Sequence, residues 1–381
     1  MIKMKIIITQ RIVPEYRINF FRLLNNKLES NEIYFKVFHG SKKFPNNLKL
    51  NKLFKKVFSC EIAYSMKGVS EKIIILPTLL IHLIKYKPDL IISEGSSFFP
   101  NSIYIYLYSK IFKTPYVLWS LGPIPKHEYS KIRWFFKPFI ELFEKNATSF
   151  ICYSIYSRNY FSKKYGKPCY CAFNSIEKRH TKSEYKLIKS NINQKFAERD
   201  ILNIVFIGRL IPQKKVNVLL EAISMIKDIP IHLYIIGDGN QEKELIKLTK
   251  VLKIDDKVSF LGKISEKEEK EEIFKKCHLG ILPGLGGLAI QEMLWHGIPV
   301  ITSSADGTEL DLVKNGKGGL YLEKISNSTL SYVIVDYYKM DKDKKIQMAH
   351  NGLKIINNKY NLDMMVNSFI DAIKDNLSLE F

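Results

Sequence analysis

The sequence predicts an α/β protein with two doubly wound domains. Short apolar runs alternate with longer amphipathic stretches, a pattern that is typical of parallel βαβ units. This alternation occurs twice along the chain, and a polar, charge-rich stretch at 176–200 separates the two series as a predicted linker. A chain of 381 residues is also long for a single domain and suits two.

The first series predicts a domain over residues 1–175. Compact apolar runs rich in isoleucine, valine and aromatic residues indicate buried strands, and the stretches between them have helical character. The expected strands are 5–9, 35–39, 90–93, 116–119 and 150–154. The expected helices include 19–28, 71–85 and 157–165.

The second series predicts a domain over residues 201–359. Its first helix is clearest, because apolar residues recur at helical spacing on one face of 216–226. The expected strands are 204–207, 231–236, 258–261 and 279–282, with another beginning at Val300. Further helices are expected at 245–252 and 266–277, and a last helix lies near 362–377.

Composition excludes several classes of protein. A hydrophobic content of 46% and a charged content of 25% are typical of a globular chain, not a disordered one. The five cysteines are odd in number and scattered, and Cys169 and Cys171 lack a partner pair at zinc spacing, so we expect free thiols in a reducing compartment.

We interpret the N-terminus as a strand and not as a signal peptide, because no small-residue cleavage site follows it. No run of 18 uncharged apolar residues predicts a transmembrane helix.

Charge is distributed unevenly along the chain. The net charge is +21, and residues 1–180 carry 30 Lys and Arg against 11 Asp and Glu, a balance of +19. Residues 181–381 balance to only +2. A general lysine bias would affect both halves equally, so the first half indicates an anionic partner: a membrane surface, a phosphorylated lipid or a nucleic acid.

Residues 126–145 interleave cations with aromatic side chains. Trp134, Phe135, Phe136 and Phe139 alternate with lysines and an arginine there. Basic and aromatic residues together are what an interfacial membrane-binding segment needs. The alternative is a core-facing helix whose cations reach past apolar surface to water.

The most informative motif spans residues 283–301. An apolar strand runs into Pro283 and a glycine cluster, and a helical run carrying Glu292 follows. Glycines at a strand-to-helix junction allow a ligand to approach the backbone, and a helix N-terminus attracts anions. An acid one or two turns into the helix can reach a ribose hydroxyl. The glycines are Gly284, Gly286 and Gly287, and Gly297 and Pro299 end the helix. The motif therefore indicates a bound nucleoside diphosphate.

A second motif, Gly-Arg-Leu-Ile-Pro-Gln-Lys, follows the first strand of the second series. Gly208 allows a tight exit from the strand, and Arg209 and Lys214 can neutralise a diphosphate. Taken alone, the same residues also suit a surface turn with two solvated cations.

The order of these motifs resembles the C-terminal domain of retaining, nucleotide-sugar-dependent glycosyltransferases of the large family 4 branch. Gly-Arg-Leu…Lys, Ile-Ile-Gly-Asp-Gly, Pro-Gly-Leu-Gly-Gly-Leu…Glu and Gly-Ile-Pro-Val-Ile-Thr succeed one another between Ile204 and Leu322. The resemblance implies the GT-B fold, in which two Rossmann-like doubly wound domains face each other across a cleft. Residues 1–175 would bind the acceptor and 201–359 the donor. A C-terminal helix at about 360–381 would pack back on the first domain.

The resemblance also implies roles for individual residues. Arg209 and Lys214 match the catalytic cations that bind the donor diphosphate and stabilise charge on the leaving group. They would supply what a metal ion supplies elsewhere, so we expect neither a metal nor a cofactor. Glu292 matches the second glutamate of the Glu-x7-Glu signature, at the nucleotide ribose. Gly208, Gly286, Gly287 and Leu288 complete the expected donor site.

The chain departs from the family pattern at two places. The first signature glutamate falls at Gly284, as in the subset with a Pro-Gly-x-x-Gly-Leu form, so backbone groups of the glycine loop would hold the sugar. Related N-terminal domains carry a Trp-Gly-His-Gly-like segment, whereas this chain has Leu121 in place of the histidine.

Three polar residues near strand ends are candidates for the acceptor side. Open α/β sheets place ligands at the carboxyl ends of their strands. Glu94 follows the strand at 90–93, and His127 and Glu128 follow Trp119. Positions on a surface loop are the alternative for all three.

These features predict a cytoplasmic hexosyl transferase that associates peripherally with the inner face of the cell membrane through its basic N-terminal domain. It would move a sugar from a nucleotide diphosphate sugar to a lipid-linked or polysaccharide acceptor in capsule, lipopolysaccharide or exopolysaccharide synthesis. Two alternatives remain open. One is a catalytically weak or inactive partner subunit, which Gly284 and Leu121 favour. The other is a basic nucleic-acid-binding protein, but no nucleic-acid partner is expected, because no such motif supports it.

Overall fold

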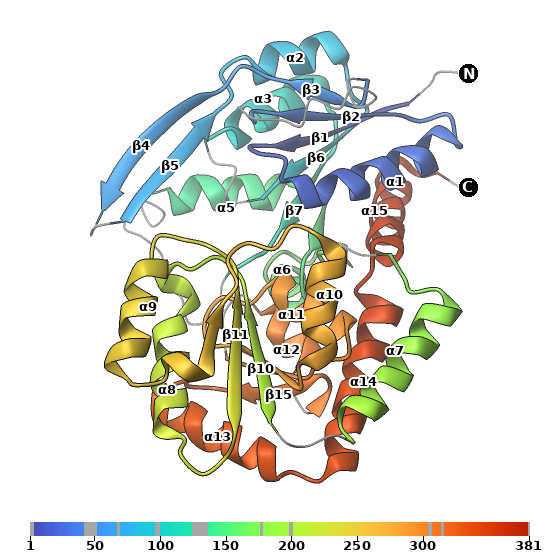
Figure 1. Ribbon diagram of the computed structural model, residues 1–381. Helices are drawn as coiled ribbons and strands as arrows, with labels where there is room; N and C mark the ends of the chain where they lie inside the picture. The colour runs from blue at the N-terminus through green and yellow to red at the C-terminus, as the bar shows by residue number, and fades with distance from the viewer. Residues whose placement is uncertain are drawn as a thin grey trace. The chain divides into compact units, whose positions relative to one another are not determined.

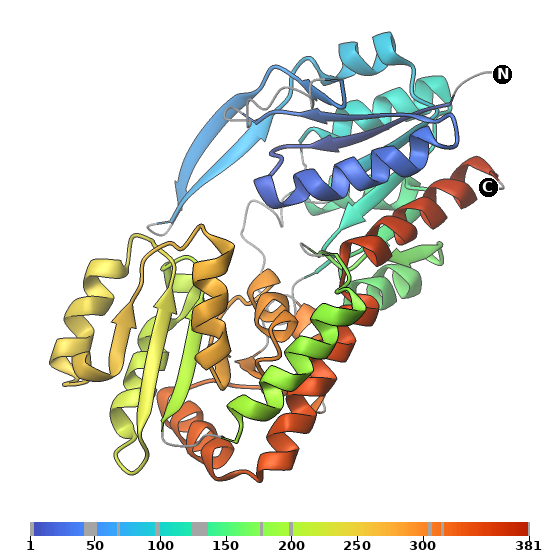
Figure 2. The same ribbon diagram turned by 45° about the vertical axis from the view of Figure 1, so that its right-hand side comes forward.

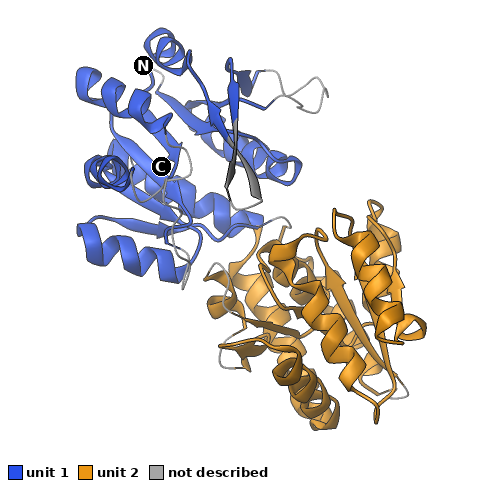
Figure 3. Ribbon diagram, turned by 90° about the vertical axis from the view of Figure 1, so that its left-hand side faces the viewer, with its two compact units in different colours: residues 1–123, 127–176, 362–381 blue, residues 124–126, 177–361 orange. Residues whose placement is uncertain are grey.

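The computed structural model describes residues 4–41, 52–66, 69–95, 100–123, 136–175, 178–197, 201–303, 307–313 and 316–379. The chain divides into two compact units, coloured separately in Figure 3. Unit 1 contains residues 1–123, 127–176 and 362–381, and unit 2 contains residues 124–126 and 177–361. Each unit is built on one parallel sheet with helices on both faces, so the prediction of two doubly wound α/β domains is confirmed.

The sheet of unit 1 has the strand order β3-β2-β1-β6-β7-β8-β9, and every pair is parallel. Its strands are β1 (Lys5–Gln10), β2 (Tyr34–His39), β3 (Phe54–Lys56), β6 (Leu90–Glu94), β7 (Tyr116–Ser120), β8 (Ser149–Cys152) and β9 (Cys169–Cys171). Helices α1 (Ile18–Glu29) and α15 (Leu362–Leu377) supply the core on one face. On the other face lie α2 (Leu79–Tyr86), α3 (Ser102–Phe112), α5 (Lys137–Asn146) and α6 (Ile155–Tyr165).

The helix expected over residues 71–85 is wrong in its first half. Strand β5 (Val69–Ile75) occupies that part of the sequence and pairs antiparallel with β4 (Cys60–Met66). Helix α2 begins only at Leu79, after Pro77. The isoleucine run at the end of β5 has stiff β-branched side chains that favour strand, and a proline cannot continue a helix.

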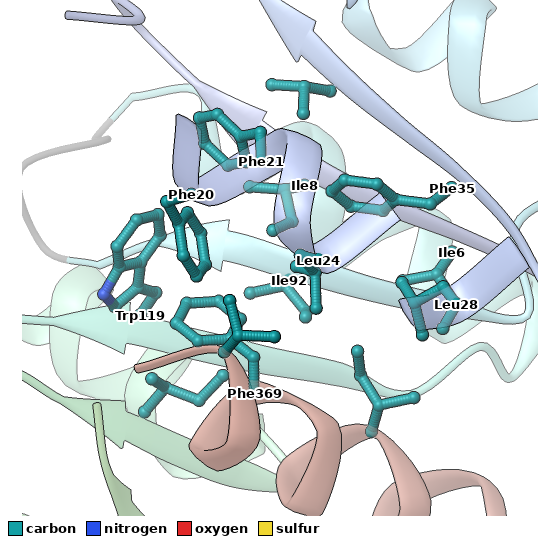
Figure 4. Packing of buried hydrophobic residues seen from close by; sticks show 14 of the residues in the cluster. Ile6, Ile8, Phe20, Phe21, Leu24, Leu28, Phe35, Ile92, Trp119 and Phe369 are labelled. Carbon is teal, nitrogen blue, oxygen red and sulfur yellow. The ribbon is translucent and has the colours of Figure 1, made fainter. Parts of the chain in front are cut away.

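An aromatic cluster joins the C-terminal helix to the sheet of unit 1 (Figure 4). The Phe369 ring of α15 lies 4.8 Å from the Phe20 ring of α1 and 4.9 Å from the Trp119 ring of β7. All three side chains are buried. This packing explains why the last helix belongs to unit 1 although unit 2 precedes it in the sequence.

The sheet of unit 2 has the strand order β12-β11-β10-β13-β14-β15, and it too is parallel throughout. Its strands are β10 (Leu202–Ile207), β11 (Ile231–Ile236), β12 (Val258–Phe260), β13 (Leu279–Leu282), β14 (Val300–Ser303) and β15 (Gly319–Leu322). Its longer helices are α8 (Val216–Met225), α9 (Glu242–Val251), α10 (Lys267–Lys276), α11 (Leu288–Trp295), α13 (Asn327–Lys339) and α14 (Lys342–Lys359), and α12 (Thr308–Leu312) is a short one. The strand order reverses direction between β10 and β13, so the two loops that follow these strands begin side by side.

The stretch expected as a linker, 176–200, contains the helix α7 (Lys182–Lys195). Its first turn is closed by a capping box, in which Thr181 and Glu184 each bond the other's backbone N–H. Buried Ile192 packs with Leu353 of α14, and Figure 2 shows the two helices side by side. The Thr-x-x-Glu signature is therefore the signal for a helix in this polar segment.

Within the described residues, no helix has both the length and the apolar character needed to cross a bilayer.

We predict that Phe369→Ala lowers the free energy of unfolding of unit 1 by about 3–5 kcal/mol, because it removes a buried ring and leaves a cavity. Met364→Ala in the same helix is the matched control, because that side chain is exposed and should change stability by less than about 0.5 kcal/mol. Urea unfolding followed by tryptophan fluorescence measures both. Equal losses in the two variants would contradict this account of how α15 is held.

Candidate functional site

The candidate site of unit 2 lies at the carboxyl edge of its sheet, between β10 and β13. All strands of the sheet run in one direction, so the loops that follow β10, β11 and β13 start at the same edge. The reversal of strand order between β10 and β13 is a topological switch point, where open α/β sheets form a crevice for ligands. Both sequence motifs fall there: the 208–214 loop follows β10, and the glycine loop, residues 284–287, follows β13.

Lys214, at the end of the 208–214 loop, joins it to the glycine loop. It ends the short 3₁₀ turn η4 (Pro212–Lys214), and its Nζ donates a 2.5 Å hydrogen bond to the carbonyl oxygen of Leu285 in the glycine loop. The same Nζ lies 3.6 Å from the position that a Cβ on Gly208 would occupy. Arg209, next to Gly208, is exposed. The structure thus places both predicted cations on the loop that borders the glycine loop, with Lys214 anchored and Arg209 open to solvent.

Besides the Lys214 side chain, backbone hydrogen bonds hold the 208–214 loop in place. Its amide at Gly208 donates to the carbonyl oxygen of Ile236 (3.0 Å), and its amide at Leu210 donates to that of Asp238 (2.7 Å). From the other side, the amide of Leu285 donates to the carbonyl oxygen of Gln213 (3.1 Å). These bonds tie the loop to the two loops that flank it in space.

Glycines make this close approach possible. A Cβ on Gly237 would lie 2.0 Å from the carbonyl oxygen of Gly208, and one on Gly239 would lie 2.2 Å from that of Leu210. A Cβ on Gly284 would lie 2.0 Å from the carbonyl oxygen of Gln213. No side chain fits at such distances. The sequence motif Ile-Ile-Gly-Asp-Gly therefore has a structural role that its pattern alone did not reveal.

The glycine loop leads into helix α11, which begins at Leu288. Gly287 has φ +53° and ψ −128°, a conformation that glycine adopts readily and other residues avoid. This turn aims the N-terminus of α11, and with it the positive end of the helix dipole, at the carboxyl edge of the sheet. Gly286 is less constrained, because a Cβ there would meet side-chain atoms of Ile290 and Leu282, and no backbone atom is among its nearest neighbours.

Glu292 lies one turn into α11 and forms an ion pair that the sequence did not reveal. Lys270 of α10 donates from Nζ to its Oε1 at 2.7 Å, and both side chains are mostly buried. The pair fixes the carboxylate in place. Its partner lies 22 residues away on another helix, a separation at which no local spacing rule could identify it.

His296 ends α11 and packs against Phe274 at 4.8 Å between ring centroids. Burial, with a smaller contribution from nearby His180, lowers the pKa of His296 to about 3. The imidazole is therefore neutral at physiological pH, in keeping with a packing role.

In unit 1, Glu94 ends β6 and is bound by Arg11 at the end of β1. The backbone N–H of Arg11 donates to Oε2 at 2.9 Å, and its guanidinium donates to Oε1 at 2.9 and 3.2 Å. This arrangement gives Glu94 a structural partner at the carboxyl edge of the sheet. His127 and Glu128, the other two acceptor-side candidates, lie outside the described residues.

A second arginine at this edge was missed by sequence reasoning. Arg17 donates to the side-chain oxygen of Gln10 (2.8 Å) and to the hydroxyl of Tyr153 (2.6 Å), and its guanidinium lies 4.2 Å from the centroid of the Trp119 ring. Burial raises the pKa of Tyr153, so its phenol stays protonated beside the cation. Arg17 ends the 3₁₀ turn η1 (Glu15–Arg17) between β1 and α1, and no role could be assigned to it from the sequence.

No group of three or more His, Cys, Asp or Glu side chains in the described part of the chain is placed to hold a metal ion.

Part of the chain matches a known protein family, and two curated proteins are similar to it in sequence. Residues 189–354 match the family Glycosyl transferases group 1. The chain is 25% identical over 228 residues to the uncharacterized glycosyltransferase MJ1178 of Methanocaldococcus jannaschii. The aligned region covers 58% of this chain and 57% of that protein. The chain is 30% identical over 178 residues to protein CapJ of Staphylococcus aureus, covering 44% and 42%. The chain thus spans about half the length of the curated relatives it matches.

Solved structures resemble the whole chain. Alr3699/HepE of Anabaena, solved with UDP, superimposes with a TM-score of 0.71 at 16% identity and covers 98% of this chain and all of that one. The lipopolysaccharide outer core galactosyltransferase WaaB superimposes with a TM-score of 0.67 at 16% identity, covering 98% and 99%. These likenesses concern the fold, which is GT-B. Residues 189–354 therefore match the family Glycosyl transferases group 1, and the chain has the GT-B fold.

Proposed function

We propose that this protein is a retaining glycosyltransferase that moves a hexose from a nucleotide diphosphate sugar to a lipid-linked or polysaccharide acceptor. The observation that carries the proposal is the pairing of the 208–214 loop with the glycine loop at the switch point of unit 2. Lys214 bonds the glycine loop that leads into α11, and Arg209 belongs to the same loop as Lys214; cations and a helix N-terminus both favour an anionic ligand. The family of this domain and the UDP bound by a protein of the same fold support a nucleotide sugar as donor.

In this proposal each residue of the site has a definite task. The diphosphate lies against the start of α11, where backbone amides from Gly287 and Leu288 face it. Arg209 and Lys214 stabilise the negative charge that grows on the leaving nucleoside diphosphate as the glycosidic bond breaks. Glu292, oriented by Lys270, accepts hydrogen bonds from the ribose hydroxyls.

Surface-glycan assembly is the proposed setting. One protein of the same fold is a lipopolysaccharide outer core galactosyltransferase. The basic first half of the chain, with a balance of +19, suits an acceptor or a membrane that carries negative charge. Peripheral association with the cytoplasmic face of the cell membrane would bring the donor site to lipid-linked acceptors.

The absence of a side chain at Gly284 affects how the donor sugar can be recognised. The family signature has a glutamate at this position, but the approach of Gln213 leaves no room for any side chain. We propose that the backbone of the glycine loop holds the sugar in its place. A catalytically inactive partner subunit is the second candidate, because the missing carboxylate removes a sugar contact. Nucleotide binding without turnover over a broad panel of donors would favour that second candidate.

We predict that Lys214→Met and Arg209→Met each reduce sugar transfer by roughly 10²–10³-fold, because each removes a charge that stabilises the leaving group. Lys215→Met is the matched control, since Lys215 is exposed and lies just outside the loop. Transfer of labelled sugar from a panel of nucleotide sugars to lipid-linked and polysaccharide acceptors measures the effect, and melting temperatures check folding. Transfer at the wild-type rate in both variants would refute the assignment.

We also predict that an excess of EDTA leaves the transfer rate unchanged, because the two cations supply the electrostatic stabilisation that a divalent ion supplies in other enzymes. The same assay run with and without added Mg²⁺ and Mn²⁺ checks this. Loss of turnover in EDTA, with recovery on adding either ion, would show that a metal takes part.

Gly284→Ala should weaken binding of the nucleoside diphosphate at least tenfold, about 1.4 kcal/mol, because its Cβ forces the glycine loop away from Gln213 and Lys214. Gly284→Glu should be no better, although it restores the family residue. Gly286→Ala should have the smaller effect, since only the Ile290 side chain has to move. Isothermal titration calorimetry compares the three. Tighter binding by Gly284→Glu than by wild type would contradict the steric account.

A further inference from the structure

Three neighbouring helices of unit 1 present a strongly apolar outer face. Helices α2, α3 and α5 pack their inner sides on the sheet, and α3 contacts both of the others (Figure 1). Large apolar side chains on their outer sides are between 43% and 67% exposed. We call this surface the α2–α3–α5 face, and its residues are Ile81 and Ile84 of α2, Ile103, Leu107, Ile111 and Phe112 of α3, and Phe139 and Leu142 of α5.

This clustering differs from the way apolar residues are exposed on the helices of unit 2. There, Met225 of α8, Val251 of α9 and Tyr332 of α13 are between 51% and 77% exposed, but each is the single exposed large apolar residue on its helix. Scattered apolar residues are normal on a protein surface, whereas a contiguous patch indicates an interaction site. The α2–α3–α5 face therefore requires a partner with an apolar component.

The charge of this face indicates what kind of partner it has. Helices α2 and α3 contain no acidic residue. Of the two acids of α5, Glu141 pairs with Lys164 at 2.8 Å, and Glu144 is buried and accepts a hydrogen bond from the hydroxyl of Tyr165 at 2.7 Å. The exposed lysines on or beside the three helices are Lys85, Lys87, Lys110, Lys113, Lys137 and Lys145.

An apolar centre with a basic border matches the chemistry of an anionic lipid bilayer. Isoleucine, leucine and phenylalanine side chains can enter the boundary between headgroups and acyl chains, while lysines bind headgroup phosphates. Phe139 also belongs to the basic and aromatic segment 126–145, for which membrane contact is one of the two interpretations of the sequence; residues 126–135 of that segment lie outside the described residues.

We propose that the α2–α3–α5 face docks the protein on a bilayer of anionic phospholipid. Ile103, Leu107 and Ile111 recur at helical spacing along α3 and form the centre of the contact. The proposal refines the membrane association in the proposed function, on which it rests for its biological setting. Vesicle binding requires no sugar or nucleotide, so the two proposals can fail separately.

Vesicle sedimentation tests the proposal with the full chain. The probes are vesicles of phosphatidylglycerol and phosphatidylcholine in equal parts, and vesicles of phosphatidylcholine alone. Wild type should sediment with the anionic vesicles at low salt and much less with the neutral ones. The triple variant Ile103→Ser, Leu107→Ser, Ile111→Ser should bind the anionic vesicles roughly tenfold more weakly or worse, because three apolar side chains no longer enter the bilayer.

The matched control is Met225→Ser, Val251→Ser, Tyr332→Ser, which removes from unit 2 three apolar side chains that are on average even more exposed than those of α3. It should bind vesicles as wild type does. Unchanged melting temperatures and an unchanged thermal shift with nucleoside diphosphates establish that both triple variants remain folded with an intact unit 2. Vesicle binding equal to wild type in the α3 variant, or no binding by wild type, would overturn the proposal.

A second copy of the chain is the other occupant that the face could take. Light scattering distinguishes a dimer formed through this face from a monomer that docks on a membrane. A wild-type dimer that the α3 substitutions convert to monomer, without any vesicle binding by wild type, would overturn the lipid assignment and identify the face as a dimer interface.

Discussion

The candidate site depends on the close approach of three loop backbones at the carboxyl edge of unit 2. The 208–214 loop lies between the loop that follows β11 and the loop that follows β13, and hydrogen bonds of 2.7–3.1 Å join them. Glycines at 237, 239 and 284 are required because any Cβ there would collide with a carbonyl oxygen. The positions of Arg209 and Lys214 follow from this packing, since both belong to the loop that it immobilises.

The same constraint explains much of what could be predicted from the sequence. Parallel strands and their glycine-containing exits are local patterns, so the residue order alone is enough to place the motif around Gly208 and the motif around Gly287 at one sheet edge. The Lys270–Glu292 pair and the Arg11–Glu94 pair could not be predicted, because each joins residues on different elements. The antiparallel pairing of β4 with β5 could not be predicted either, because the apolar residues of β5 have a spacing that also fits a helix.

The two units divide the chain's physical properties between them. Unit 2 contains the glycine loops and the Lys270–Glu292 ion pair, which suits selective binding of a small anion. Unit 1 combines most of the positive charge with an acid-free pair of helices and a patch of exposed apolar side chains. The aromatic contacts of Phe369 keep the end of the chain with unit 1. A division of this kind fits a protein that takes one substrate from water and the other from a membrane.

The central claim is that the switch point of unit 2 binds a nucleoside diphosphate without a metal ion. A thermal-shift screen of the purified protein against UDP, GDP, ADP, CMP and their common sugars, each with and without EDTA, tests it most directly. A ligand that binds only the folded state raises the melting temperature. The account predicts a shift with one nucleoside diphosphate and its sugars, and the same shift in EDTA. A well-folded sample that shifts with none of them, or only when a divalent ion is present, would contradict it.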